Sequence, residues 1–298
     1  MKLKSFFACF FLASLSAFLC GCDYNIQEAL FRDNSVENRV TALSDNIIPS
    51  DKLPSTFKTT DKIKVAIITD VHFGVQGKDS VNQKFLDWIA DSSNNIDFCI
   101  CLGDVAEHGA EDEYKTYASY VDQIKTALGG SPVFSVVGNH DLFSSGWSYW
   151  KQYVNKDLGL KTSFYKFSLG GYEWYFLDTA SGTMGRSQFK AFKEDIESEL
   201  KPKLVFSHYP IYSDGANLAN YFTLQNSMET SRIIDACARN GVQLFASGHT
   251  HRWASKNFGR FWEVNFTGFR SRQDWGYIEI DTVNKTVSAY KSDGTKLN

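Results

Sequence analysis

The stretch IKVAIITDVH, residues 63–72, determines how the rest of the chain is interpreted. Its first seven residues form a run rich in β-branched side chains, which is typical of a strand covered on both faces. The run ends in Asp70 and His72. In open α/β sheets, functional sites assemble at the carboxyl ends of the strands. The stretch therefore predicts a buried strand with functional side chains at its end.

The same pattern recurs along the chain. The strand-like segments CICLG, FSVVG, KLVFS and LFASG each run directly into an aspartate, an asparagine or a histidine. Five of the six histidines lie at such strand ends, which is not expected of histidines with separate structural roles. We predict that these residues form one site. They are Asp70, His72, Asp104, Asn139, His140, Asp141, His208, His249 and His251.

The donor atoms of this set are nitrogen and oxygen, with no thiolate among them. Such donors suit Mn, Fe or Zn, and the ligand types alone do not choose among these metals. The set is too large for one ion and suits two. Two ions about 3.5–4 Å apart are a known device for displacement at phosphorus. The sequence therefore predicts a dinuclear centre acting on a phosphoester.

From Lys62 onward, strand-like and helix-like segments alternate. Helices are expected near residues 80–93, 111–128, 187–200 and 230–240, and an antiparallel strand pair is expected around a turn at Gly170 and Gly171. Three further strand-like runs, FWEVNFTG, YIEIDT and TVSAYK, follow near the end of the chain. This order predicts a layered α/β sandwich.

The first residues have the pattern of an export signal. Lys2 and Lys4 precede an apolar run that is too short to span a membrane. The run ends in LCGCD, which resembles a bacterial lipoprotein signal cleaved before Cys22. We expect a signal peptide at residues 1–21, a polar tether at 22–60 and one domain at 61–298. A cleaved signal without lipid remains the alternative.

Composition limits the partners. The formal net charge of −3 provides no basic field, so bulk binding of nucleic acid is not expected. After the predicted lipidation of Cys22, three cysteines remain in the mature chain, too few for a disulfide framework. Cys99 and Cys101 lie in a strand-like run and are predicted to be buried apolar side chains.

The motifs DVH, GD, GNHD, SHYP and GHTH occur in this order between residues 70 and 251. Together they resemble the calcineurin-like metallophosphoesterases, and the resemblance covers residues 61–290. It implies an α/β/β/α sandwich of two mixed sheets flanked by helices.

The resemblance also implies roles for the strand-end residues. The first metal would be held by Asp70, His72, Asp104 and His251. Asp104 would bridge to a second metal, which Asn139, His208 and His249 would complete. A hydroxide bridging the metals would attack phosphorus. His140 would stabilise the transition state or protonate the leaving oxygen, and Asp141 would orient its ring.

Substrate choice is less defined. The purple acid phosphatases of this family carry a tyrosine three residues after the GD aspartate, where this chain has Glu107. The chain therefore resembles the branch that includes the class III cyclic-nucleotide phosphodiesterases. His108, Arg252 and Arg270 are candidate substrate-binding residues, although ordinary loop roles are the alternative. Four aromatic residues near the motifs could stack on a base or could simply pack in the core. They are Phe143, Trp147, Tyr209 and Tyr212.

These observations favour an exported, lipid-anchored, dinuclear phosphoesterase that hydrolyses nucleotide-type diesters at the periplasmic or outer surface. The membrane partner would be reached through the lipid on Cys22. A phosphomonoesterase or nucleotidase of the same fold is one alternative. A non-catalytic, metal-binding lipoprotein is another. The sequence predicts no oligomeric state.

Overall fold

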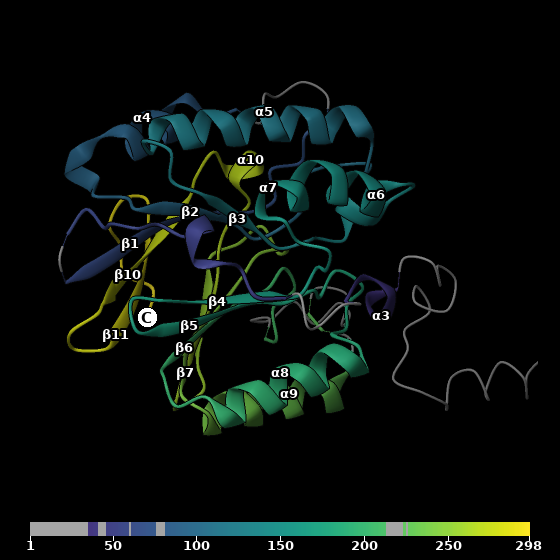
Figure 1. Cartoon of the computed structure of the whole chain (residues 1–298), viewed down its shortest axis with the longest axis vertical. Coiled ribbons are helices and arrows are strands. Elements are labelled where there is room, and N and C mark those ends of the chain that lie inside the picture. Colours follow the sequence, from purple (N-terminus) through teal and green to yellow (C-terminus); the bar gives the residue numbers. More distant parts are fainter. Residues whose placement is uncertain (1–34, 41–45, 60, 76–80, 213–222, 225) are drawn as a thin grey trace, which may run out of the picture.

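Two β-sheets lie face to face at the centre of the molecule (Figure 1). The computed structural model describes residues 35–40, 46–59, 61–75, 81–212, 223–224 and 226–298. The first sheet contains β1 (Lys62–Ile68), β2 (Phe98–Cys101), β3 (Val133–Ser135), β10 (Gly276–Asp281) and β11 (Thr286–Lys291), in the spatial order β11-β10-β1-β2-β3. The second sheet contains β4 (Tyr165–Leu169), β5 (Tyr172–Phe176), β6 (Lys203–Phe206), β7 (Val242–Ser247), β8 (Ala254–Asn257) and β9 (Trp262–Asn265), in the order β4-β5-β6-β7-β9-β8.

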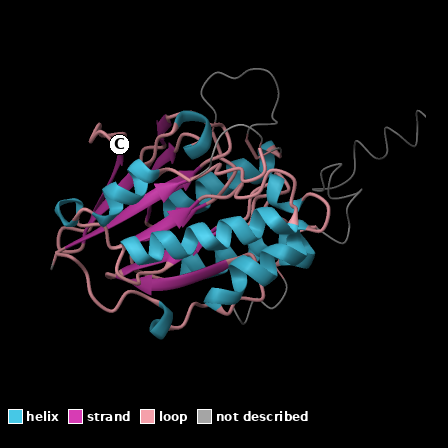
Figure 2. Cartoon of the chain, turned by 90° about the horizontal axis from the view of Figure 1, so that it is seen from above, coloured by secondary structure: helices cyan, strands magenta, loops and turns pink. Residues whose placement is uncertain are grey.

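Helices cover the outer face of each sheet (Figure 1), and the view from above shows helices lying across the strands (Figure 2). The helices α4 (Gln83–Ala90) and α5 (Glu111–Ala127) lie over the first sheet, and α8 (Arg186–Ser198) and α9 (Ser227–Arg239) lie over the second. The shorter helices are α3 (Val36–Arg39), α6 (Gly146–Trp150), α7 (Lys156–Leu158) and α10 (Phe269–Arg272). Four layers with two mixed sheets confirm the predicted α/β/β/α sandwich.

The apolar run of β1 is explained by this layering. Val65 and Ile67 face the aromatic core between the two sheets, whereas Ala66 and Ile68 face the cluster beneath α4 and α5. Successive side chains of a strand point to opposite faces, so a strand covered on both sides must be apolar throughout. The same burial holds for β2, where Cys99 and Cys101 are buried free thiols as predicted.

Most of the predicted elements are present, but the last third of the chain contains elements that the sequence did not predict, among them the helix α10. The strand β8 was not predicted, and its residues are mostly exposed. The strand-like runs near the end of the chain also divide between the sheets, because β9 joins the second sheet whereas β10 and β11 join the first. Within the described residues, no helix is long and apolar enough to cross a membrane.

The described part of residues 22–60 is not the polar tether that we predicted. Val36 and Val40 are buried against the second sheet, and Ile47 forms a parallel bridge with Lys166 of β4. Arg39 is fully buried, and its guanidinium makes two contacts with the Asp178 carboxylate, Nε to Oδ2 at 2.7 Å and Nη2 to Oδ1 at 2.9 Å. Residues 35–40 and 46–59 therefore belong to the folded domain, which begins before residue 61.

The buried ion pair gives a stability prediction. Replacing Arg39 by alanine leaves the Asp178 carboxylate buried without its cation, and breaking such a pair costs about 3–5 kcal/mol. We expect Arg39→Ala to lower the free energy of unfolding by that amount in urea titrations. Arg239→Ala is the matched control, because its pair with Asp235 is exposed and should contribute less than about 1 kcal/mol. Equal losses in the two variants would contradict this assignment.

Candidate metal centre

The predicted site residues lie at the carboxyl ends of five strands. Asp70 and His72 follow β1, Asp104 follows β2, and Asn139 and His140 come after β3. His208 follows β6, and His249 and His251 come after β7. The strands β1, β2 and β3 are parallel neighbours in one sheet, as β6 and β7 are in the other. The carboxyl ends of these strands meet at one edge of the sandwich. The side chains that follow the strands of the first sheet therefore lie beside those that follow the strands of the second.

The structure groups these side chains into three overlapping triads. They are Asp70–His72–His251, His72–Asp104–His140 and Asp104–His208–His249. Within each triad, one donor atom per residue lies within 4.8 Å of the others. His72 and Asp104 each belong to two triads, so the groups form one continuous site with Asp104 at the junction.

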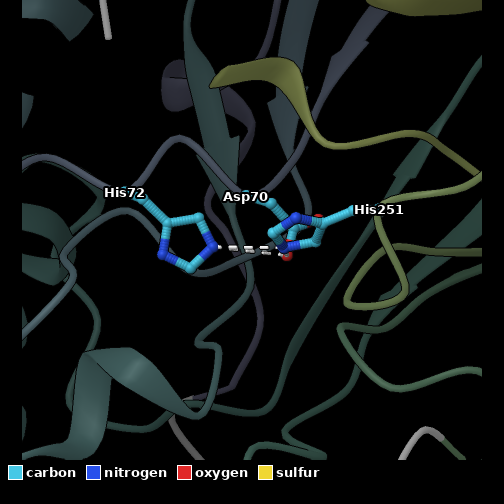
Figure 3. A group of neighbouring side chains, drawn as sticks. All are labelled: Asp70, His72 and His251. Atoms are coloured by element: carbon cyan, nitrogen blue, oxygen red, sulfur yellow. Dashed lines mark hydrogen bonds and ion pairs between the residues drawn. The ribbon is translucent and has the colours of Figure 1, made fainter. Parts of the chain in front are cut away.

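The first triad converges on a common point (Figure 3). The two Nε2 atoms of His72 and His251 are 3.2 Å apart, and His251 Nε2 is 3.1 Å from Asp70 Oδ1. That carboxylate oxygen is buried and accepts no hydrogen bond of ordinary geometry. Two imidazole nitrogens that converge on a buried carboxylate oxygen without a hydrogen-bond partner are suited to a cation. The residues present therefore fit a metal ion.

The second cluster is centred on His208. Its Nδ1 lies 2.7 Å from the carbonyl oxygen of Leu102, an acceptor that requires a proton on this nitrogen. Nε2 is thereby directed into the site, 3.3 Å from Asp104 Oδ2, 3.0 Å from Asn139 Oδ1 and 3.2 Å from His249 Nδ1. A backbone carbonyl that fixes the ring is the usual support for a metal-binding histidine.

The electrostatics of Asp104 and His208 are coupled. Burial opposes ionisation of Asp104, but the charge and hydrogen bond of His208 outweigh it and lower the pKa of the carboxyl group well below its usual range. Burial also acts against the charge of His208, while Asp104 raises the pKa of the imidazole to about 9. At neutral pH, metal binding to His208 must therefore release a proton.

Backbone strain is concentrated at the same residues. Nine described residues other than glycine have a positive φ, and five of them are predicted ligands. These five are Asp70 (56°), His72 (49°), Asp104 (52°), His249 (67°) and His251 (54°). Such conformations cost of order 1–3 kcal/mol each and cluster at functional sites.

Two glycines allow the backbones to approach closely. A Cβ atom at Gly138 would lie 2.2 Å from Asp104 Oδ1, and one at Gly248 would lie 2.0 Å from Thr69 Oγ1. Any side chain at these positions would displace the strand ends that carry the ligands. The requirement for glycine at these two positions is therefore space.

The predicted role of Asp141 is wrong. Its Oδ1 accepts hydrogen bonds from the backbone N–H groups of Val105 and Ala106, and its Oδ2 accepts one from Gly138. The carboxylate is fully buried by these contacts and holds the loops after β2 and β3 together. The ring of His140 is instead oriented by the carbonyl oxygen of Glu107, 2.8 Å from its Nδ1.

Glu107 is the residue that sequence reasoning missed. Its Oε2 lies 2.7 Å from His72 Nδ1 and 3.6 Å from His140 Nδ1. The side chain therefore faces both a candidate metal ligand and the candidate acid. The sequence drew attention to this position only because it lacks a tyrosine. Its place three residues after Asp104, at the same strand end, was the available signal.

The three candidate substrate-binding residues differ in their surroundings. His108 is paired with Glu113, with Nδ1 2.9 Å from Oε1, and its side chain is mostly exposed. Arg252 is exposed. Arg270 begins beside the site, where its backbone N–H reaches the carbonyl of Asp70. Its Nε is buried without a hydrogen-bond partner, so this guanidinium has unused donors for an anion.

A sandwich with such a cluster of carboxylates and imidazoles at its strand ends is suited to bind metal ions. Residues 63–253 match the family described as calcineurin-like phosphoesterase, and the chain belongs to this family. It is therefore a metal-dependent phosphoester hydrolase. Two proteins named probable cyclic nucleotide phosphodiesterase support the predicted branch.

The first of these, from Fibrobacter succinogenes, is 27% identical over 202 residues, which cover 63% of this chain and 73% of the relative. The second, from Xenorhabdus bovienii, is 25% identical over 171 residues, covering 52% and 61%. A dimetal phosphatase from Danio rerio has the same fold, with a TM-score of 0.60 at 13% identity over 80% of this chain and 98% of that one. A purple acid phosphatase from yellow lupin gives a TM-score of 0.54 at 14% identity, covering 82% and 54%.

The overlap of the triads predicts metal stoichiometry. We expect the protein, loaded with Mn²⁺ and passed through a desalting column, to retain about two ions per chain. His249→Ala should retain about one, because it removes a ligand from the second cluster only. His108→Ala should retain both ions. Plasma emission spectrometry measures the content, and loss of both ions in His108→Ala would contradict this division.

The position of Glu107 gives a separate prediction. Glu107→Gln keeps the size of the side chain but removes the negative charge beside His72 and His140. We expect metal affinity or turnover to fall roughly 10- to 100-fold, as is typical when a carboxylate behind a metal-binding histidine is removed. Asp112→Asn, at an exposed position on α5, should change neither quantity. Unchanged metal affinity and kcat in Glu107→Gln would show that the carboxylate lies beside His72 and His140 without supporting either of them.

Proposed function

We propose that this protein is a dinuclear phosphodiesterase that acts on nucleotide-type diesters outside the cytoplasm, held to the membrane by a lipid on Cys22. The observation that carries the catalytic part is the junction at Asp104, whose carboxylate is shared between two clusters of donor atoms. When bound, two ions there would supply a nucleophile at neutral pH and neutralise charge on the phosphoryl oxygens.

His140 is placed to move a proton. Its backbone N–H donates to Asp104 Oδ1 at 2.9 Å, which fixes the residue against the junction of the two clusters. Its ring Nδ1 faces the carbonyl oxygen of Glu107, an acceptor that requires a proton on that nitrogen. Nε2 is then the atom that exchanges a proton. We assign to it the protonation of the leaving oxygen.

Arg270 is our candidate for binding the substrate phosphate. Its backbone is joined to Asp70, and its buried Nε has no hydrogen-bond partner. A guanidinium can hold two phosphoryl oxygens at once. His108 and Arg252 remain weaker proposals for the same task, because His108 is already paired with Glu113 and Arg252 is exposed.

The test of the activity compares bis-p-nitrophenyl phosphate with p-nitrophenyl phosphate after EDTA treatment and Mn²⁺ addition. We expect metal-dependent cleavage with a higher kcat/KM for the diester. His140→Asn should lower kcat by about 10²-fold or more while the metal content stays unchanged, since general acid catalysis contributes about 10²–10⁴-fold. A preference for the monoester would move the assignment to a phosphatase or nucleotidase. Two bound metals with no activity would favour the binding-protein alternative.

The proposed anchor rests on sequence alone, because residues 1–34 lie outside the described part of the chain. Lysines before an apolar run that ends at LCGC support export and lipidation of Cys22. In a bacterial host, we expect the wild-type protein in the membrane fraction and partitioning into detergent. Cys22→Ala should lose the lipid, which mass spectrometry of the N-terminal peptide reports directly. Recovery of both proteins in the soluble cytosolic fraction would contradict this proposal.

A further inference from the structure

The four aromatic residues considered for base stacking differ in their exposure and in their neighbours. Tyr209 stacks on His249 with ring centroids 3.9 Å apart and is 5% exposed, and Trp147 is buried in the core under α5. Tyr212 faces the Lys256 ammonium and the ring of Phe258. Phe143 alone of the four combines a largely free surface, 45% exposed, with a position beside the candidate acid.

The ring of Phe143 borders the reaction centre on one side. Its centroid is 4.9 Å from that of the His140 imidazole, at an interplanar angle of 55°. The His140 ring also makes an edge contact with the ring of His72, with centroids 4.8 Å apart. The His140 side chain is itself 29% exposed, so the exposed ring of Phe143 lies next to a histidine that solvent can reach.

Hydrogen bonds and close packing fix the backbone that carries this ring. Phe143 N–H donates to the carbonyl of His140, and the Phe143 carbonyl accepts from Gly146 at 2.8 Å. The following residue, Ser144, has a φ of 52°. A Cβ atom at Gly109 would lie 2.2 Å from the Phe143 carbonyl oxygen, so the loop after β2 packs directly on this turn. Because the backbone of this turn is already ordered, it loses little conformational entropy when the phenyl ring binds a partner.

We propose that Phe143 forms the leaving-group subsite and that it stacks on the base of a nucleoside released by cleavage. The inference rests on the proposed function, in which His140 protonates the leaving oxygen. The group attached to that oxygen must then lie beside the His140 ring, where Phe143 is an exposed apolar side chain within the described part of the chain. Flat bases stack on aromatic side chains with little sequence preference, so the subsite would accept purine and pyrimidine nucleosides alike.

The test uses two ligands that share ribose and phosphate and differ only in the base. Adenosine 5′-monophosphate and ribose 5-phosphate are titrated by calorimetry into the Mn²⁺-loaded protein. We expect the wild-type protein to bind the nucleotide more tightly. Phe143→Ala should weaken nucleotide binding roughly tenfold and leave ribose 5-phosphate unchanged, whereas Phe143→Trp should retain the preference. Leu200→Ala, which removes an exposed side chain on the other side of the second sheet, is the control.

Several outcomes separate this inference from the proposed function. An unchanged ratio of the two affinities in Phe143→Ala would overturn the subsite, as would an equal loss for both ligands, which indicates a structural role. Failure of the wild-type protein to cleave any diester would remove the proposed function, while the calorimetric ratio still decides whether Phe143 stacks on the base. If the protein releases phosphate from the nucleotide, the KM values of the two monoesters replace the dissociation constants in the same comparison.

Discussion

The carboxylate of Asp104 is fully buried, and a charge in that position is expensive to maintain unless cations and hydrogen bonds surround it. Here the backbone N–H of His140 donates to Oδ1, while His208 and His72 approach Oδ2 at 3.3 and 3.8 Å. These partners come from three different strand ends in two sheets. The arrangement of the site follows from this one group, because each neighbour that stabilises the carboxylate is also either a candidate ligand or the candidate acid His140.

The two sheets supply the rigidity that this arrangement needs. Aromatic rings fill the space between them, including the stacked pair Tyr165–Phe176 with centroids 4.5 Å apart. Because protein cores are close-packed, the strand ends on opposite sheets cannot drift independently. Donor atoms held in this way face one another before any metal arrives. This preorganisation has an energetic cost, part of which is the backbone strain at the five ligands with positive φ.

The sequence predicted features that depend on neighbouring residues better than features that depend on contacts between residues far apart in the chain. The strand ends could be located in the sequence because a strand buried on both faces requires a continuous apolar run. The polar donor residues mark where each run stops. The fold and the candidate ligands followed from that local pattern. The role of Asp141 did not, because a carboxylate beside a histidine in sequence can bond to backbone groups instead, as it does with Val105 and Gly138. Contacts far apart in sequence were equally hidden, such as that of Arg39 with Asp178.

The position of β10 has a consequence for how much of the chain can fold alone. The family match ends at residue 253, yet β10 pairs with β1 along the whole strand, from Lys62 opposite Asp281 to Ile67 opposite Gly276. A chain ending at residue 253 would leave β1 with a row of unsatisfied amides on one side, and such edges recruit strands from other molecules. When β10 and β11 are present, β11 forms this edge of the sheet instead. It is a largely polar strand that is only partly buried. The last hairpin thus protects the catalytic sheet from self-association.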